Sequence, residues 1–222
     1  MRINGVNGRE GVCMNRKMIC GIVLALFAVF SACAQYDRES DFRFELLDGG
    51  RAAVITGYVG TRQTVRIPPR IQGSLVTAIG FRAFSEKEII SVTIPNSVTN
   101  IGVGAFEGNQ LTSVVIPDSV IEIGADAFCE TQLTSVNIGN SVTVIGSSAF
   151  SDNLLTSVVI PDSVTVILDG AFNDNPITHI IIGANVNIFA PSTQNRFHEF
   201  YHAQGRRAGT YTWNDGWSVE FR

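Results

Sequence analysis

The sequence predicts a repeat solenoid, a chain wound into a right-handed stack of coils with one parallel β-sheet. Two observations predict this fold. Four segments of 22 residues follow one another without a gap from Val92: VTIPNSVTNIGVGAFEGNQLTS, VVIPDSVIEIGADAFCETQLTS, VNIGNSVTVIGSSAFSDNLLTS and VVIPDSVTVILDGAFNDNPITH. A fixed period of this length is typical of stacked repeat architectures. The composition agrees, since 21 glycines with many valines, isoleucines and threonines favour strands and turns.

Each repeat contains a short strand followed by a turn. Residues 111–116 (LTSVVI) have an alternating pattern and are rich in β-branched side chains, which predicts a strand. Pro117 ends this strand, because proline cannot donate a hydrogen bond to a ladder. Val120 and Ile123 then point inward, and Ala127-Phe128 fill the far side in a single helical or 3₁₀ turn. One coil buries too few side chains to offset the entropy of ordering 22 residues, so only the stacked array is stable.

The repeats occupy residues 65–190 and are flanked by two expected caps. A diverged first copy runs from Val65 to Phe84, lengthened by five residues, and a partial last copy covers 180–190. Residues 35–64 form an N-terminal cap, because Phe42–Leu47 and Ala52–Tyr58 are strand-like around Asp48-Gly49-Gly50. Residues 191–222 form a C-terminal cap with a short helix and a hairpin around 214–216. Solenoid ends expose apolar faces and need such covers.

Residues 1–34 have the pattern of an export signal. Arg16 and Lys17 precede an apolar run, Met18–Phe30, and small residues follow it. Met14 is an alternative start. Three outcomes stay open: cleavage before Gln35, lipidation of Cys33 through a lipobox-like Phe30–Cys33, and an uncleaved anchor. All three predict an exported protein, at the cell surface or outer membrane or in the periplasm. Contact with a membrane is expected only through a lipid anchor at Cys33 or through the uncleaved leader.

Charge and cysteine content exclude several classes of protein. Apolar residues make up 45% and charged residues 16%, which excludes a disordered chain and a coiled coil. The formal net charge of −4 argues against nucleic-acid binding, and residues 92–190 carry nine acidic side chains but neither Lys nor Arg. Cys129 is the one cysteine outside the leader region, so no disulfide framework is expected within the mature chain.

The repeat resembles the BspA-type leucine-rich repeat family of bacterial surface proteins. The shared pattern is L-x-x-V-x-I-P-x-S-V-x-x-I-G-x-x-A-F-x-x-N, over about residues 65–190. Asn109, Asn153 and Asn175 stand where many members carry Cys, and Thr131 is the exception. Residues 208–217 (AGTYTWNDGW) resemble a family cap. The resemblance implies a leucine-rich-repeat solenoid and a role in adhesion or protein binding, and it leaves the ligand open.

The outward side of the strands is the candidate binding surface. In a strand, the neighbours of inward residues point outward, and this rule selects Thr93, Val115, Asn137, Val159 and Ile181, beside Ser113, Ser135, Ser157 and His179. Three aliphatic residues among five outward positions predict an exposed apolar patch for a protein ligand, with a host extracellular matrix component as one candidate. The alternative is structural, because parallel strands accept β-branched residues on both faces.

One motif suggests chemistry. His198-Glu199-Phe200-Tyr201-His202 matches H-E-x-x-H, in which two histidines on one helix face bind zinc. Ala208 occupies the place of a third ligand, and the aromatic spacing instead predicts a capping helix that starts at Ser192 or Thr193 and stops at Gly205. No other catalytic or cofactor motif is present, so no enzyme and no cofactor are expected. A structural envelope protein and a zinc hydrolase remain as alternatives to a binding protein.

Overall fold

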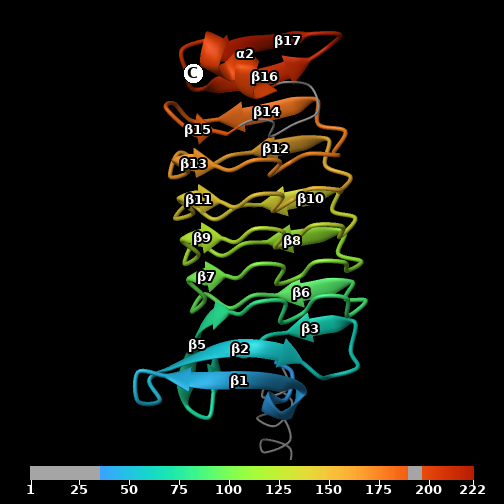
Figure 1. Cartoon of the computed structure of the whole chain (residues 1–222), viewed down its shortest axis with the longest axis vertical. Coiled ribbons are helices and arrows are strands. Elements are labelled where there is room, and N and C mark those ends of the chain that lie inside the picture. The colour runs from blue at the N-terminus through green and yellow to red at the C-terminus, as the bar shows by residue number, and fades with distance from the viewer. Residues whose placement is uncertain (1–35, 190–196) are drawn as a thin grey trace, which may run out of the picture. The chain divides into compact units, whose positions relative to one another are not determined.

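The repeats stack as coils along one axis, and each coil contributes two short strands (Figure 1). The computed structural model describes residues 36–189 and 197–222. The predicted leader, with its expected cleavage sites and Cys33, lies outside these residues. Within them, no helix has the length and apolar character that crossing a bilayer requires.

The predicted strands form the first column. Its members are β3 (Thr64–Arg66), β6 (Ser91–Thr93), β8 (Ser113–Val115), β10 (Ser135–Asn137), β12 (Ser157–Val159) and β14 (His179–Ile182). They pair in parallel as β3–β6, β8–β10 and β12–β14, and the last two pairs are offset by one repeat length of 22 residues. The alternation in the sequence therefore identified the strands and their register.

A second column of strands lies where the sequence analysis placed only a turn. It contains β5 (Ser74–Ile79), β7 (Asn100–Ile101), β9 (Glu122–Ile123), β11 (Val144–Ile145), β13 (Val166–Ile167) and β15 (Asn187–Ile188). These strands pair in parallel without interruption from β5 to β15. The last isoleucine of each of these strands is buried, because it faces the core between the two columns.

The far side of each coil is built from turns. In the third coil, Cys129 N donates to Asp126 O at 3.2 Å, an i to i+3 bond of the 3₁₀ type. The turn does not continue as a helix, because Asp126 and Glu130 have positive φ angles of 54° and 55°. Alternate N–H groups therefore point along the stack, and Phe128 N donates to Ala149 O of the next coil at 2.8 Å.

Phenylalanines form a continuous column inside the coils. The rings of Phe84, Phe106, Phe128, Phe150 and Phe172 stack with neighbouring centroids 5.0–5.4 Å apart and interplanar angles of 3–15°. All five side chains are buried. The 22-residue spacing of the phenylalanines is thus a spacing of one ring per coil, which confirms the repeat prediction.

Buried asparagines connect the turns to the strands. Asn109 Nδ2 donates to Phe84 O at 2.8 Å, and its Oδ1 accepts from Ile89 N at 2.9 Å. Asn153 and Asn175 repeat this arrangement. Each amide satisfies backbone groups of two successive coils that have no ladder partner there, so the asparagine holds the coils in register.

A hairpin forms the start of the described chain. A 3₁₀ turn, η2 (Glu39–Asp41), leads into β1 (Phe42–Leu47) and β2 (Ala52–Tyr58), which pair antiparallel with a bulge between Arg43 and Phe44. β2 then pairs in parallel with β5, whose other partner in the cap is β4 (Arg70–Ile71). Tyr58 stacks on Phe84 at 5.5 Å, so the cap extends the aromatic column.

A helix and a second hairpin follow the last coil. The helix α2 (Phe197–Ala203) precedes β16 (Gly209–Trp213) and β17 (Trp217–Phe221), and β16 pairs antiparallel with β14. Phe197 packs edge-on against Tyr211 at 5.2 Å and lines the last coil's core. The expected helix start at Ser192 or Thr193 lies outside the described residues; the helix ends at Ala203, before Gly205.

Candidate interaction surface

The outward side chains of the first strand column form what we call the sheet face. It comprises Thr93, Val115, Asn137, Val159 and Ile181 in one row and Ser91, Ser113, Ser135, Ser157 and His179 in the next. Val115 is 63% exposed and Val159 is 55% exposed, while Ile181 is half-buried. The other residues of both rows are exposed. The face therefore presents two exposed valines and the half-buried Ile181 among hydroxyl groups, one amide and the imidazole of His179.

Strand register brings these residues together in pairs. Val115 lies opposite Asn137, Val159 lies opposite Ile181, and Thr93 lies opposite Arg66. The rows also extend beyond the predicted residues, because Thr210 of the C-terminal cap lies opposite Ile181. Sequence analysis missed Arg66, although the diverged copy at Val65 indicated it. It missed Thr210 because the repeat sequence contains no pattern that indicates which cap strand pairs with the last repeat.

The sheet face is interrupted twice. Within a pair the strands stay bonded past their ends, since Ile67 N donates to Thr93 O at 3.1 Å and Ile116 N donates to Asn137 O at 2.8 Å. Among residues 36–189 no ladder joins β6 to β8 or β10 to β12. The pairs β3–β6, β8–β10 and β12–β14 are therefore separate sheets, and only the last continues into the C-terminal cap. Across these two gaps the facing edges of the strands have no ladder partner in one another.

A hollow of about 350 Å³ lies at the first interruption. Its walls are β6 and β8, and it is lined by Ser91, Val92, Thr93, Ile94, Asn96, Ser113, Val114, Val115 and Pro117. The hollow combines the exposed methyl groups of Val115 with hydroxyl groups and backbone edges. Such a mixture suits an extended peptide or a protein loop, which offers apolar side chains and backbone hydrogen bonds together.

Comparison with known proteins decides the family. The BspA type leucine rich repeat region matches residues 77–198 in six copies, which is more than half of the chain. The chain belongs to the BspA-type leucine-rich repeat family. Leucine-rich repeats of this kind generally mediate protein–protein interaction, and their fold is typically non-enzymatic. No curated protein matches the sequence.

Solved structures of two bacterial leucine-rich repeat proteins resemble this BspA-type chain. A leucine-rich repeat protein of T. pallidum has a TM-score of 0.64 and 26% identity, over 72% of this chain and 83% of that one. A leucine-rich repeat protein of Bacteroides ovatus has a TM-score of 0.56 and 27% identity, over 69% of this chain and 41% of that one. The likeness supports the predicted solenoid fold.

The H-E-x-x-H segment of this BspA-type protein lies on the short capping helix α2. His198 Nε2 lies 4.0 Å from Glu199 Oε1, and His202 is exposed near the end of the helix. Tyr201 between them is buried against Tyr211. Across residues 36–189 and 197–222, no three His, Cys, Asp or Glu side chains are grouped to hold a metal ion. The aromatic residues of the motif thus act in the cap.

Cys129 is the one described cysteine, and its environment suppresses its reactivity. Burial, followed by the Asp152 carboxylate beside it, raises the pKa of the Cys129 thiol to about 11. Its Sγ lies 4.0 Å from Asp152 Oδ2. The thiolate is the reactive form, so Cys129 is nearly unreactive near neutral pH.

We expect iodoacetamide to modify Cys129 at pH 8 roughly 100-fold more slowly in the folded protein than in urea, because a raised pKa removes the thiolate. The folded rate should rise with pH up to about 11. Asp152→Asn should lower this pKa and speed the reaction, and asparagine tolerates the positive φ of 54° at this position. Mass spectrometry of the Cys129 peptide measures the rates; equal rates in buffer and urea would contradict the pKa assignment.

Proposed function

We propose that this protein is exported and binds a protein ligand on its sheet face, as a surface adhesin or interaction protein. The observation that carries this proposal is the exposure of Val115 and Val159, at 63% and 55%, on a face whose other exposed side chains are polar. Exposed aliphatic groups framed by polar ones are typical of protein-binding sites.

The hollow between β6 and β8 supports the same surface. It lies beside Val115 and provides a recess of about 350 Å³ for a projecting side chain of the ligand. The membership in a repeat family that generally mediates protein–protein interaction supports the class of function. The charged, apolar and small-residue order of residues 16–34 supports export, with lipidation of Cys33 as the form that would hold the protein at a membrane.

The sheet face is tested by placing charge on its valines. Val115→Asp together with Val159→Asp should weaken capture of the ligand by about 100-fold, since each carboxylate without a partner in an interface costs about 1–3 kcal/mol. The assay is binding of the secreted protein to a panel of immobilised extracellular matrix proteins. Circular dichroism should stay unchanged, because both side chains project from the fold.

A matched control uses aliphatic residues off the sheet face. Val103→Asp with Ile121→Asp adds the same charge at positions that are 43% and 48% exposed, and it should leave capture unchanged. Equal loss in both double variants would overturn the sheet face as the site. Absence of any wild-type capture, with the protein inaccessible to protease on intact cells, would instead favour a structural envelope protein.

A further inference from the structure

The junction between the N-terminal cap and the first repeat is less closed than the junctions between repeats. Neighbouring coils are joined along their turns by three backbone hydrogen bonds, as when Gly104, Phe106 and Gly108 donate to the third coil. Within residues 36–189, one such bond joins the cap to the first turn, from Tyr58 N to Ala83 O at 2.8 Å. The first turn is therefore open on its cap side.

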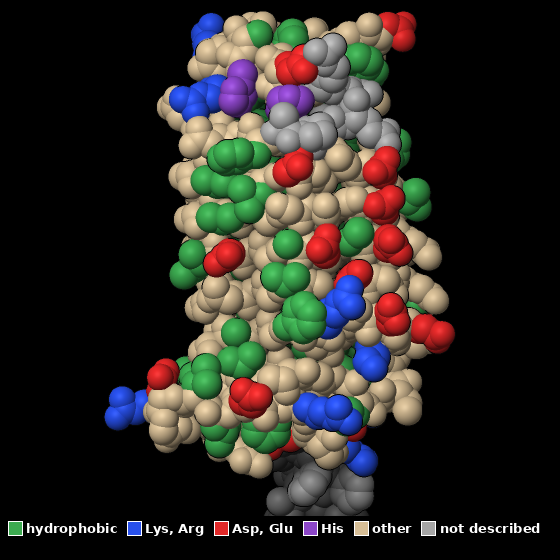
Figure 2. Space-filling view, viewed as in Figure 1, with side chains coloured by type: hydrophobic (Ala, Val, Ile, Leu, Met, Phe, Trp, Pro, Cys, Tyr) green, Lys and Arg blue, Asp and Glu red, His purple; other side chains and the backbone are tan. Residues whose placement is uncertain are grey.

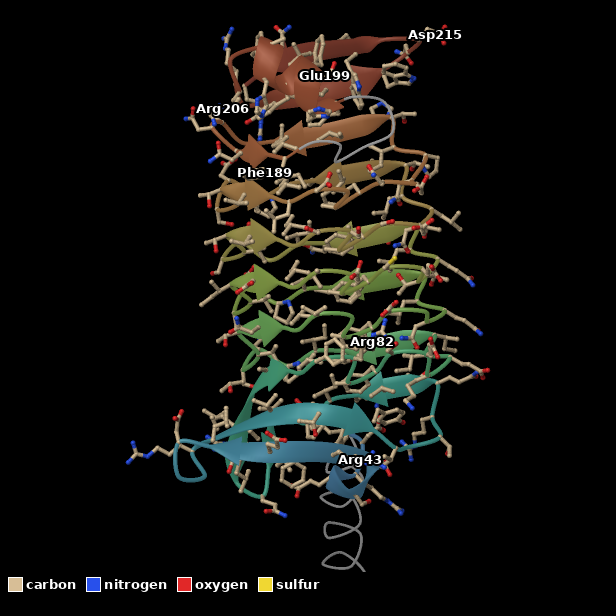
Figure 3. The ribbon with its side chains drawn as sticks, in the orientation of Figure 1. Arg43, Arg82, Phe189, Glu199, Arg206 and Asp215 are labelled. Atoms are coloured by element: carbon tan, nitrogen blue, oxygen red, sulfur yellow. The ribbon has the colours of Figure 1, made fainter. Side chains whose placement is uncertain are left out.

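A polar hollow of about 320 Å³ lies at this junction. Its lining is contributed by three elements, the strand β1, the end of β2 and the first turn with the loop after it. We call it the basic hollow, and it is lined by Arg43, Thr56, Gly57, Tyr58, Val59, Gly60, Arg82, Ala83 and Lys87. Figure 3 labels Arg43 on β1 and Arg82 in the coil above it. Figure 2 shows Lys and Arg side chains gathered over the N-terminal elements of this face.

The cations of the basic hollow depart from the repeat pattern. Gly104, Asp126, Ser148 and Gly170 occupy the position of Arg82 in the later repeats, and Asn109, Thr131, Asn153 and Asn175 occupy that of Lys87. The later residues at the Lys87 position are buried and donate hydrogen bonds to backbone carbonyl groups of the turn, whereas Lys87 is exposed. The repeat architecture does not need a cation at either place.

The three cations are only partly neutralised. Arg82 Nη2 lies 2.9 Å from Glu107 Oε2, which holds the guanidinium in place. Within the described part of the chain, neither Arg43 nor Lys87 has a carboxylate within 4.0 Å. Glu86 and Glu88 flank Lys87 in the sequence and are exposed. The lining itself contains these three cations and no carboxylate, in a chain whose formal net charge is −4.

We propose that the basic hollow binds a sulfate or phosphate ester carried by a sugar of a polysaccharide. A tetrahedral oxyanion presents several acceptor oxygens, which suit the guanidinium group of Arg43 on β1 and the guanidinium and ammonium groups of Arg82 and Lys87 in the first turn and its loop. A recess of this volume is at the lower end of the sizes that hold small ligands, and it suits a single sugar unit. The nine acidic side chains of residues 92–190 repel a polyanion, so we do not expect it to bind along these repeats.

The test compares two double variants of the full chain with the same loss of charge. Arg43→Ala with Lys87→Ala removes two cations of the hollow, and Arg51→Ala with Arg70→Ala removes two exposed cations outside it. The probe is dextran sulfate, with uncharged dextran as its control, at fixed salt. We expect the first variant to raise the Kd for dextran sulfate at least tenfold and the second to change it less than twofold.

Thermal unfolding checks that both variants fold, since all four side chains are exposed. Equal losses in the two variants would overturn the proposal, because they would indicate attraction to net charge alone. Binding to phosphatidylglycerol vesicles without binding to dextran sulfate would also overturn it and assign the cations to a membrane surface. The sheet-face variant Val115→Asp with Val159→Asp should bind dextran sulfate like the wild type, so this test is independent of the proposed adhesin function.

Discussion

Phe128→Ala is expected to lower the free energy of unfolding by about 3–5 kcal/mol, the cost of removing a buried aromatic side chain. The ring is fully buried and stacks on Phe106 at 5.1 Å and on Phe150 at 5.4 Å. Its removal leaves a gap in the middle of the column that the backbone cannot close, because Phe128 N is bonded to Ala149 O of the next coil. Urea unfolding followed by circular dichroism measures the loss.

Two further variants show whether the column itself is responsible. Phe81→Ala removes the same group at a position that is 70% exposed, and it should change stability by less than about 0.5 kcal/mol. Phe128→Leu keeps most of the buried volume and should recover part of the loss. A loss below about 1 kcal/mol for Phe128→Ala would contradict the idea that each coil depends on its neighbours through the rings.

The sequence was sufficient for the features that recur at a fixed spacing. Phe106, Phe128 and Phe150 are 22 residues apart, and equal spacing in a wound chain places one ring above another. The cap hairpin was predictable for a different reason, because Asp48 and the two glycines after it adopt the positive φ angles that a tight turn requires. Alternation likewise identified Val115 and Val159 as outward residues.

Features that depend on contacts between unlike segments were not predictable. A strand such as β9, Glu122-Ile123, is too short to show any period, and it becomes a strand only because β7 and β11 lie on either side of it. The basic hollow was missed because its residues belong to the N-terminal cap and to the diverged first repeat.

Asn153→Ala is expected to lower the free energy of unfolding by about 2–4 kcal/mol, because buried backbone groups then lose their partners. Asn153 Nδ2 donates to Phe128 O at 2.8 Å and to Ser151 O at 2.9 Å, and its Oδ1 accepts from Leu133 N at 2.7 Å. The side chain is 4% exposed, so water does not replace these bonds. Asn140→Ala, at an exposed turn position, is the control and should cost much less.

The chain itself supplies a second comparison for the asparagine position. Thr131 stands there in the third coil, and its Oγ1 lies 3.0 Å from Phe128 O and 2.8 Å from Asn153 Oδ1, where one hydroxyl proton serves a single acceptor. Asn153→Thr should therefore destabilise less than Asn153→Ala, and Thr131→Asn should raise the melting temperature by restoring the amide. If Asn153→Ala itself costs less than about 1 kcal/mol, the stability of the stack does not depend on side-chain bonds at this position.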